Sequence, residues 1–293
     1  MNALQGIVKR SQLTKQELDD IKVLEDICSN YENITLKLNW SMLRDNKRDS
    51  ENHIFYYENN VLVGFLGLYY FGRDEIEASG MVHPEYRRRG IYKQLVQTAK
   101  EECSSRSISC LILICPGNSA SGHAFCKNVG SDYSFTEYYM ERNDNTLMDI
   151  PAVSGLGIRQ AMKEDLDAIA RLNQNGFDMA LEDAANFASS SLLKGDTLIA
   201  ELNGTAIGKL NLRDTDNHAF IYGFVVAKEF RGKGYGRNIL MNAVVYSQEK
   251  MNRLHQSLEV AATNDRALGL YKSCGFVEKS KIDYYELKKG VHF

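Results

Sequence analysis

The stretch "FRGKGYGRNI", residues 230–239, sets three glycines among three basic residues directly after an apolar run. A loop that leaves a strand and enters a helix presents unpaired backbone N–H groups at the positive end of the helix dipole. Glycines remove the Cβ atoms that would keep a pyrophosphate from those amides, and basic side chains add charge. The stretch therefore predicts a phosphate-binding loop, although it fits neither a Walker-type loop nor the dinucleotide-binding GxGxxG. The glycines are Gly232, Gly234 and Gly236, and the basic residues are Arg231, Lys233 and Arg237.

An earlier copy of this stretch lies in the first half of the chain. "MVHPEYRRRGIYKQL", residues 81–95, matches "VVAKEFRGKGYGRNI", residues 225–239, with corresponding residues 144 positions apart. "YYENNVLVGFLGLYY" at 56–70 resembles "IAELNGTAIGKLNLR" at 199–213, with Gly64 and Gly208 again 144 positions apart, and later landmarks keep this offset within two positions. A constant offset across several motifs in one order predicts a tandem duplication of a domain of about 145 residues.

The seam between the copies falls near "DIPAVSGLG", residues 149–157, where Pro, Ser and Gly replace the periodic pattern. We expect one domain over residues 1–150 and another over 151–293. Each is predicted to be an α/β domain of the α+β type, with a mixed, mainly antiparallel twisted sheet flanked by helices. In the second copy, Asn203-Gly204 predicts a tight hairpin turn. The helix after the loop is expected to bury Leu240, Ala243, Val244 and Leu254.

Composition limits the class of protein. The chain has 35 basic and 38 acidic residues in 293, for a net charge of −3, so we expect no nucleic-acid or membrane surface. "CLILIC" at 110–115 is too short to cross a bilayer, and the N-terminus lacks a signal-peptide pattern, so we expect a cytoplasmic protein. The six cysteines form no metal-binding pattern, so they are expected to be reduced packing residues with no metal.

Two motifs of the second copy together resemble the GCN5-related N-acetyltransferase (GNAT) family. The family's acetyl-CoA pyrophosphate loop reads (Gln/Arg)-x-x-Gly-x-(Gly/Ala), which residues 231–236 satisfy. Its other signature, "LEV…N…A…LY…GF", is matched by "LEVAATNDRALGLYKSCGF" at 258–276. The resemblance covers residues 157–288. It implies an acetyl-CoA-dependent N-acetyltransferase that acts on an amine of a small molecule or peptide.

The resemblance also implies how the acetyl-CoA is held. In the family, the strand before the loop splays from its neighbour at a bulge and binds the pantetheine arm and thioester carbonyl through its backbone. An unpaired strand edge can accept an amide-bearing arm much as it accepts another strand. The implied cofactor contacts are Phe224, Val225, Val226, Arg231, Gly232, Lys233, Gly234, Tyr235, Gly236, Arg237 and Asn264.

Amide formation requires an acid for the departing thiolate and a base for the attacking amine. Tyr271 stands where the family carries its acid. Many members carry a glutamate base at the position that is Phe220 here, so the usual carboxylate is missing. Glu259 is one substitute, because strand alternation directs it away from its apolar neighbours. A water relay through Tyr222 or His218 is the alternative.

The first copy departs from both motifs. Tyr92 stands where the family has Gly or Ala, and Phe125 or Cys126 stands where it has the acidic tyrosine. Cys126 beside His123 could form a nucleophile pair, but a surface histidine is the simpler interpretation. We therefore expect a degenerate domain that supports the fold, shapes the acceptor cleft or holds a second CoA. Two alternatives for the whole chain are a non-catalytic acyl-CoA sensor and a transferase that uses another acyl donor.

Overall fold

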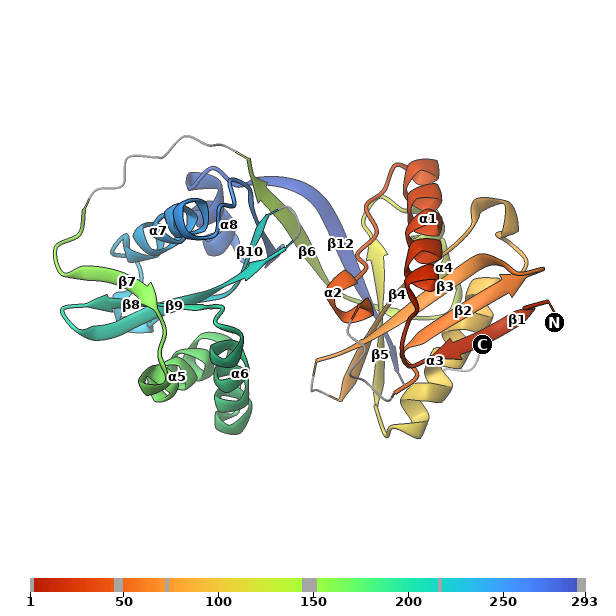
Figure 1. Cartoon of the computed structure of the whole chain (residues 1–293), viewed down its shortest axis with the longest axis horizontal. Helices are drawn as coiled ribbons and strands as arrows, with labels where there is room; N and C mark the ends of the chain where they lie inside the picture. The colour runs from red at the N-terminus through yellow and green to blue at the C-terminus, as the bar shows by residue number, and fades with distance from the viewer. Residues whose placement is uncertain (1–2, 45–49, 72–73, 144–151, 216–217, 289–293) are drawn as a thin grey trace. The chain divides into compact units, whose positions relative to one another are not determined.

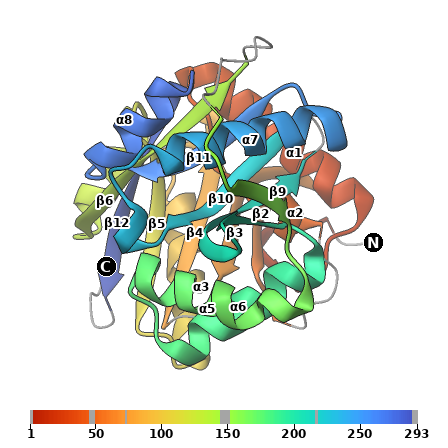
Figure 2. The ribbon, with the colours of Figure 1, turned by 90° about the vertical axis from the view of Figure 1, so that its left-hand side faces the viewer.

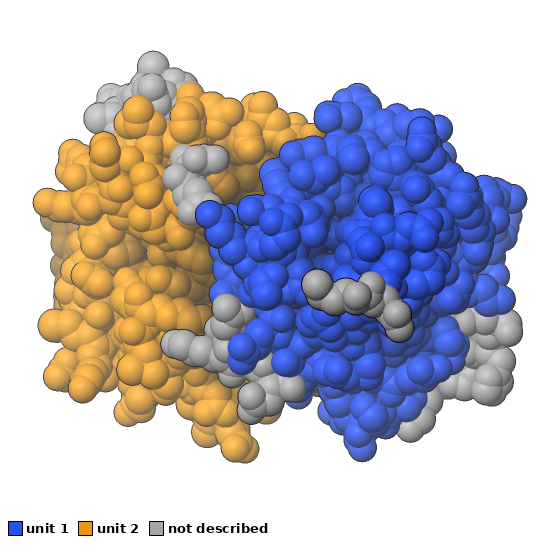
Figure 3. Space-filling model, turned by 45° about the vertical axis from the view of Figure 1, so that its right-hand side comes forward, with its two compact units in different colours: residues 1–137, 280–293 blue, residues 138–279 orange. Residues whose placement is uncertain are grey.

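The computed structural model describes residues 3–44, 50–71, 74–143, 152–215 and 218–288. The chain divides into two compact units, coloured separately in Figure 3: unit 1 comprises Met1–Glu137 and Ser280–Phe293, and unit 2 comprises Tyr138–Lys279. The predicted boundary at 150, with residues 149–151 of the predicted seam, lies outside the described residues. Each unit is a mixed, mainly antiparallel sheet flanked by helices, which confirms the predicted fold class.

Unit 1 orders its strands β1-β2-β3-β4-β5, with all neighbours antiparallel except the parallel pair β4 and β5. One face of the sheet packs on α1 and α2, and the other packs on α3 and α4. The strands are β1 (Gly6–Arg10), β2 (His53–Glu58), β3 (Val61–Tyr70), β4 (Glu75–Val82) and β5 (Cys110–Pro116). The helices are α1 (Lys15–Glu32), α2 (Trp40–Leu43), η1 (Pro84–Tyr86), α3 (Ile91–Ser105) and α4 (Ala120–Asn128).

Unit 2 repeats this plan with the order β7-β8-β9-β10-β11, and only β10 and β11 are parallel. Helices α5 and α6 cover one face of its sheet, and α7 and α8 cover the other (Figures 1 and 2). The strands are β7 (Leu156–Gln160), β8 (Thr197–Leu202), β9 (Thr205–Asp214), β10 (Ala219–Val226) and β11 (Gln256–Ala261). The helices are η2 (Lys163–Asp165), α5 (Leu166–Phe177), α6 (Leu181–Lys194), η3 (Lys228–Phe230), α7 (Tyr235–Lys250) and α8 (Asp265–Ser273).

Two long strands carry residues of both units. The unit boundaries fall inside β6 (Asp132–Arg142) and β12 (Val277–Lys288). In unit 1, residues 282–288 of β12 pair antiparallel with β5, and Tyr284 donates a 2.5 Å hydrogen bond to Glu137. In unit 2, Arg142 of β6 is fully buried and its Nε donates to the carbonyl of Cys274. Each repeat therefore contributes its last strand to both units.

The second copy contains the predicted hairpin turn and most of the predicted helix face. The predicted turn is present, because Asn203 and Gly204 link β8 to β9 with φ of 50° and 79°. Of the predicted helix face, Leu240, Ala243 and Val244 are buried. The prediction for Leu254 is wrong, since α7 ends at Lys250 and the Leu254 side chain is 47% exposed. In the described part of the chain, no helix is long and apolar enough to span a membrane.

Candidate active site

The predicted phosphate loop of unit 2 joins β10 to α7 as expected. Gly234 is the N-cap of α7 with φ of 83°, and Gly232 has φ of 76°. A Cβ built on either glycine meets no atom within 4 Å, so the space in front of the loop is open. No described side chain caps α7, which leaves the N–H groups of Tyr235 and Gly236 available to an anion, whereas that of Arg237 donates to the Gly234 carbonyl.

The other loop residues divide between contacts with the protein and exposure to solvent. Arg231 Nε donates a 2.8 Å bond to the carbonyl of Val226, so this arginine ties the loop to the end of β10. Gly236 lies under α8, because its Cβ would be 3.4 Å from Leu270. Lys233, Tyr235 and Arg237 complete the predicted set: Lys233 and Arg237 are exposed, and Tyr235 packs edge-on against Phe230.

Strand β10 splays and bulges where the resemblance implies. Its parallel pairing with β11 covers Ala219 to Ile221, and its antiparallel pairing with β9 shifts register between Tyr222 and Val225. From the bulge onward, Phe224 and Val226 pack toward α7 and α8, whereas Val225 is buried against Gly176 of α5. A cavity of about 360 Å³ lies beside this strand, lined by residues that include Arg171, Asn175, Val225 and Arg231.

Two further predicted residues lie on α8. The side chain of Asn264 accepts a 3.1 Å bond from the N–H of Ala267, so it caps the helix. Tyr271 is 9% exposed and packs edge-on against Phe276. Burial, with a smaller effect from Cys274, raises the pKa of Tyr271 to about 12. Its hydroxyl therefore keeps its proton at neutral pH and can donate it.

The predicted base candidates lie on the α5 and α6 side of the sheet or at the start of β10. Glu259 is half-buried on β11, on the face opposite Leu258 and Val260, as predicted. Tyr222 donates a 2.7 Å bond to Asp196, and burial raises its pKa to about 12, so its proton is already engaged. Burial lowers the pKa of His218.

One residue on the same face was not predicted. Lys209 of β9 is fully buried, although lysine is rarely so. The signal in the sequence was a lone charge inside the apolar run "TAIGKLNL", 205–212.

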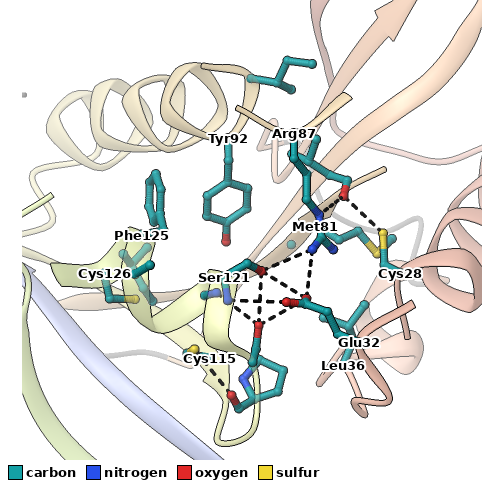
Figure 4. A pocket seen from close by; sticks show the side chains of 18 of the residues that line it. Cys28, Glu32, Leu36, Met81, Arg87, Tyr92, Cys115, Ser121, Phe125 and Cys126 are labelled. Atoms are coloured by element: carbon teal, nitrogen blue, oxygen red, sulfur yellow. Dashed lines mark hydrogen bonds and ion pairs between the residues drawn. The ribbon is translucent and has the colours of Figure 1, made fainter. Parts of the chain in front are cut away.

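Unit 1 has a groove at the corresponding place (Figure 4). Its cavity of about 380 Å³ is lined by the ends of β4 and β5, by the loop over residues 86–93 and by α4. Arg88 and Gly90 have φ of 66° and 77°, so the loop keeps the backbone conformation of Gly232 and Gly234 despite a non-glycine residue. The conformation of this loop is therefore preserved, although its glycines are reduced to one.

The side chains in this groove differ from those of unit 2. Tyr92 takes the place of Gly236, and its ring packs edge-on against that of Phe125, with the ring centres 4.6 Å apart. Arg87 donates to the Val82 carbonyl, just as Arg231 donates to the Val226 carbonyl in unit 2. Arg87 also forms a 3.1 Å ion pair with Glu32. Figure 4 shows Arg87 and Glu32 meeting beside Ser121. Part of the loop's positive charge is therefore already neutralised.

The acid and the bulge are both missing from unit 1. The N-caps of α4 and α8 are Ser119 and Asn264, and this alignment places Cys126 where unit 2 has Tyr271. Strand β4 pairs with β3 without any register shift. His123 does not pair with Cys126: its Nδ1 is 3.9 Å from Cys115 and 2.9 Å from the hydroxyl of Tyr285. All six cysteines are free thiols, as predicted. In the described residues, no group of three metal-binding side chains comes together.

Comparison with known proteins gives matches in both repeats. The model of the "Acetyltransferase (GNAT) family" matches residues 19–130 and again 163–276. A spermidine N(1)-acetyltransferase of Vibrio cholerae is 38% identical over 58 residues, which cover 20% of this chain and 34% of that enzyme. The match thus spans about a third of that relative's length.

Solved structures resemble the chain over its whole length. A GCN5-related N-acetyltransferase from Sphaerobacter thermophilus superimposes with a TM-score of 0.82 at 16% identity, covering 100% of this chain and 99% of that one. A tandem GNAT protein from the clavulanic acid biosynthesis pathway gives a TM-score of 0.74 at 16% identity, covering 98% and 99%. At such identities the likeness concerns the fold alone.

Proposed function

This chain belongs to the acetyltransferase (GNAT) family, and we propose that its unit 2 transfers the acetyl group of acetyl-CoA to a primary amine by direct attack. The two matched ranges confirm the tandem arrangement predicted from the internal repeat. The family generally uses acetyl-CoA, which supplies an acetyl thioester as the electrophile. The assignment of acetyl-CoA to unit 2 and the identity of the attacking amine belong to the proposal.

The observation that carries the proposal is the coincidence of three features in unit 2. The loop at 231–237 has open space over Gly232 and Gly234, and β10 bulges and leaves β11. Tyr271 retains its proton in the apolar cluster against which Phe224 and Val226 of β10 pack. Unit 1 keeps the loop conformation but has no bulge in the pairing of β4 with β3 and has Cys126 in place of the acid. This difference supports unit 2 as the catalytic unit and unit 1 as a degenerate copy.

The loop at 231–237 and the strand β10 of unit 2 fit the pyrophosphate and the pantetheine arm of acetyl-CoA. The first-turn amides of α7 and the loop glycines hold the pyrophosphate, while Lys233 and Arg237 add charge from the exposed side. At Phe224, Val225 and Val226 the edge of β10 no longer pairs with β11, and this edge binds the pantetheine amides and orients the thioester, while Arg231 holds the Val226 carbonyl. Arg231 and Asn264 act indirectly, because they tie down the loop and cap α8.

Proton transfer completes the mechanism. The hydroxyl of Tyr271 donates its proton to the thiolate as the carbon–sulfur bond breaks. The acceptor enters as an ammonium ion with a pKa of about 10 and must lose a proton before its nitrogen can attack. Glu259 and a water held near His218 are the predicted acceptors of that proton. Tyr222 is less suited to hold such a water, because its hydroxyl already donates to Asp196.

The proposal is tested by release of CoA from acetyl-CoA across a panel of amines that includes polyamines and peptide N-termini. Wild-type protein is expected to release CoA with at least one primary amine, and Tyr271→Phe is expected to lose most of that rate. If no amine stimulates release while CoA still binds, the sensor alternative replaces the enzyme. If propionyl-CoA or longer thioesters react and acetyl-CoA does not, the chain uses another acyl donor.

A further inference from the structure

Unit 2 contains a buried amine that the fold does not require. Lys209 projects from β9 toward α5 and α6 and has no exposed surface. Its Nζ lies 5.6 Å from the ring centre of Phe177 and 5.1 Å from that of Phe187. Within the described residues this Nζ has no hydrogen-bond partner. An unpaired buried amine costs stability, so its presence calls for a role in function.

The corresponding place in unit 1 shows what the fold alone needs. Position 65, which lies 144 residues before 209, is Phe65, a fully buried residue that packs edge-on against Phe55 with the ring centres 5.2 Å apart. The two residues hold the same register, since Lys209 pairs with Val225 and Phe65 pairs with Met81. The unit that we propose to be inactive therefore fills this position with an apolar ring, and the unit that we propose to be active places an amine there.

The amine lies next to the bulge of β10. Gly223 lies within the register shift, which falls between Tyr222 and Val225, and has φ of 57°. A Cβ built on it lies 3.0 Å from Lys209 Nζ and 3.0 Å from Asn211 Nδ2. The Asn211 nitrogen also has no partner in the described chain, while its oxygen accepts a bond from Thr197. Because Gly223 has no side chain, both nitrogens approach the backbone of β10 at the bulge, and Gly223 itself is partly exposed.

We infer that Lys209 is the general base that takes a proton from the acceptor amine. This inference rests on the proposed function of unit 2. The bulge is where the thioester carbonyl is expected, Lys209 approaches it from the α5 and α6 side, and Tyr271 approaches from the α8 side. Base and acid thus stand on opposite faces of β10, so the amine attacks from one side and the thiolate leaves toward the other.

The lone pair of Lys209 Nζ takes one proton from the acceptor ammonium, and the neutral nitrogen attacks the carbonyl carbon to form the carbon–nitrogen bond. As the carbon–sulfur bond breaks, the thiolate takes the proton of Tyr271. The attacking nitrogen sheds its second proton, which restores Tyr271, and Lys209 releases the first to solvent. The net products are the amide, CoA and one proton.

The surroundings of Lys209 suit this role. Burial alone lowers the pKa of Lys209 from 10.5 to about 7, so a neutral amine is available at physiological pH. The elements around Lys209 carry four ionisable groups, and none of them contributes to the shift in the pKa of Lys209. They are Asp178 after α5, Asp183 on α6, Asp196 before β8 and Tyr222 on β10. Once protonated, the ammonium is stabilised by the faces of Phe177 and Phe187.

The test compares wild type with Lys209→Met, Lys209→Arg and the control Lys250→Met, which removes an exposed lysine at the end of α7. For wild type, kcat/KM is expected to fall below about pH 7. At about pH 7.5, the kcat of both Lys209 variants is expected to fall about 100-fold, while the Kd of CoA stays unchanged. The fall of kcat/KM below about pH 7 is expected to disappear in both variants. The control should behave as wild type. Methionine is expected to fold because Phe65 fills the corresponding position.

A second readout does not depend on turnover. In NMR spectra of protein labelled with ¹³C at lysine Cε, one resonance is expected to titrate near pH 7 and to be absent from Lys209→Arg. The inference is overturned if the Lys209 resonance titrates near the ordinary lysine pKa. It is also overturned if both Lys209 variants are active and their kcat/KM still falls below about pH 7. If wild type releases no CoA with any amine, the proposed function fails and the base role fails with it. An active wild type with unaffected variants refutes Lys209 alone.

Discussion

Replacing Lys209 by methionine should change how the stability of the protein depends on pH. Burial lowers the pKa of Lys209 from 10.5 to about 7 in the folded state. The unfolded chain keeps the lysine proton up to its ordinary pKa, whereas the folded chain loses it above about pH 7. Between these values the unfolded state binds more protons, so the unfolding free energy rises with pH. The methionine variant lacks this dependence.

The size of this pH-dependent change in unfolding free energy follows from the lowered pKa of Lys209. Each pKa unit corresponds to about 1.4 kcal/mol, and the linkage integrated from about pH 6 to about pH 9 gives about 2.5 kcal/mol for this one group. Other titrating groups cancel when the variant is subtracted from wild type. The variant should therefore be more stable than wild type at about pH 6, and its advantage should shrink by about 2.5 kcal/mol by about pH 9.

Urea denaturation followed by far-UV circular dichroism measures this difference at each pH. Trp40, the single tryptophan, lies in unit 1, so its fluorescence gives a separate record of that unit. The reasoning is refuted if the difference between wild type and variant stays constant within about 0.5 kcal/mol across the range, the usual spread of neutral substitutions. Such a result would mean that Lys209 is solvated or paired in solution.

Three further predictions concern the loop, the acid and the hairpin of unit 2. Tyr271→Phe should lower kcat about 100-fold without changing the Kd of CoA, because only the proton is removed; steady-state kinetics and calorimetry check both, and an unchanged kcat would exclude the acid role. Arg231→Met removes the bond to the Val226 carbonyl and should weaken CoA binding, whereas Arg87→Met in unit 1 should lower the Tm and leave CoA binding intact; equal effects on binding would argue against the assignment to unit 2. Gly204→Ala forces a side chain into φ of 79° and should cost about 1 kcal/mol in urea denaturation, and no cost would contradict the turn assignment.

Much of this fold could be predicted because its signals are local or repeated. The Asn203-Gly204 turn and the loop glycines specify backbone conformations that few other residues adopt, and the constant offset revealed the duplication. Leu254 was misplaced because it follows the last turn of α7, where an apolar residue still fits the helical period. The passage of β6 and β12 from one unit to the other was not predictable, since strand pairing at long range leaves no local pattern.

The site was predictable only where its chemistry is carried by a motif. The role predicted for Tyr271 follows from the resemblance to a family motif, and that of the loop from its glycines and basic residues. The structure adds that Arg231 and Asn264 form hydrogen bonds with the protein's own backbone. Lys209 escaped prediction because a lysine between apolar residues is usually read as the exposed side of a strand. Only the three-dimensional packing shows that its amine is enclosed by two phenylalanine rings.

The central claim, that unit 2 holds the acetyl-CoA, is tested most directly by calorimetric titration of CoA into Gly234→Val and the matched Gly90→Val. Both glycines cap the helix after their loop with similar φ, and a Cβ on either meets nothing within 4 Å, so the strain introduced is comparable. Wild type should bind one CoA per chain. Gly234→Val should bind it more than about 10-fold more weakly because the side chain occupies the space over the helix amides, and Gly90→Val should bind as wild type does. Loss of binding in Gly90→Val with retention in Gly234→Val would contradict the account.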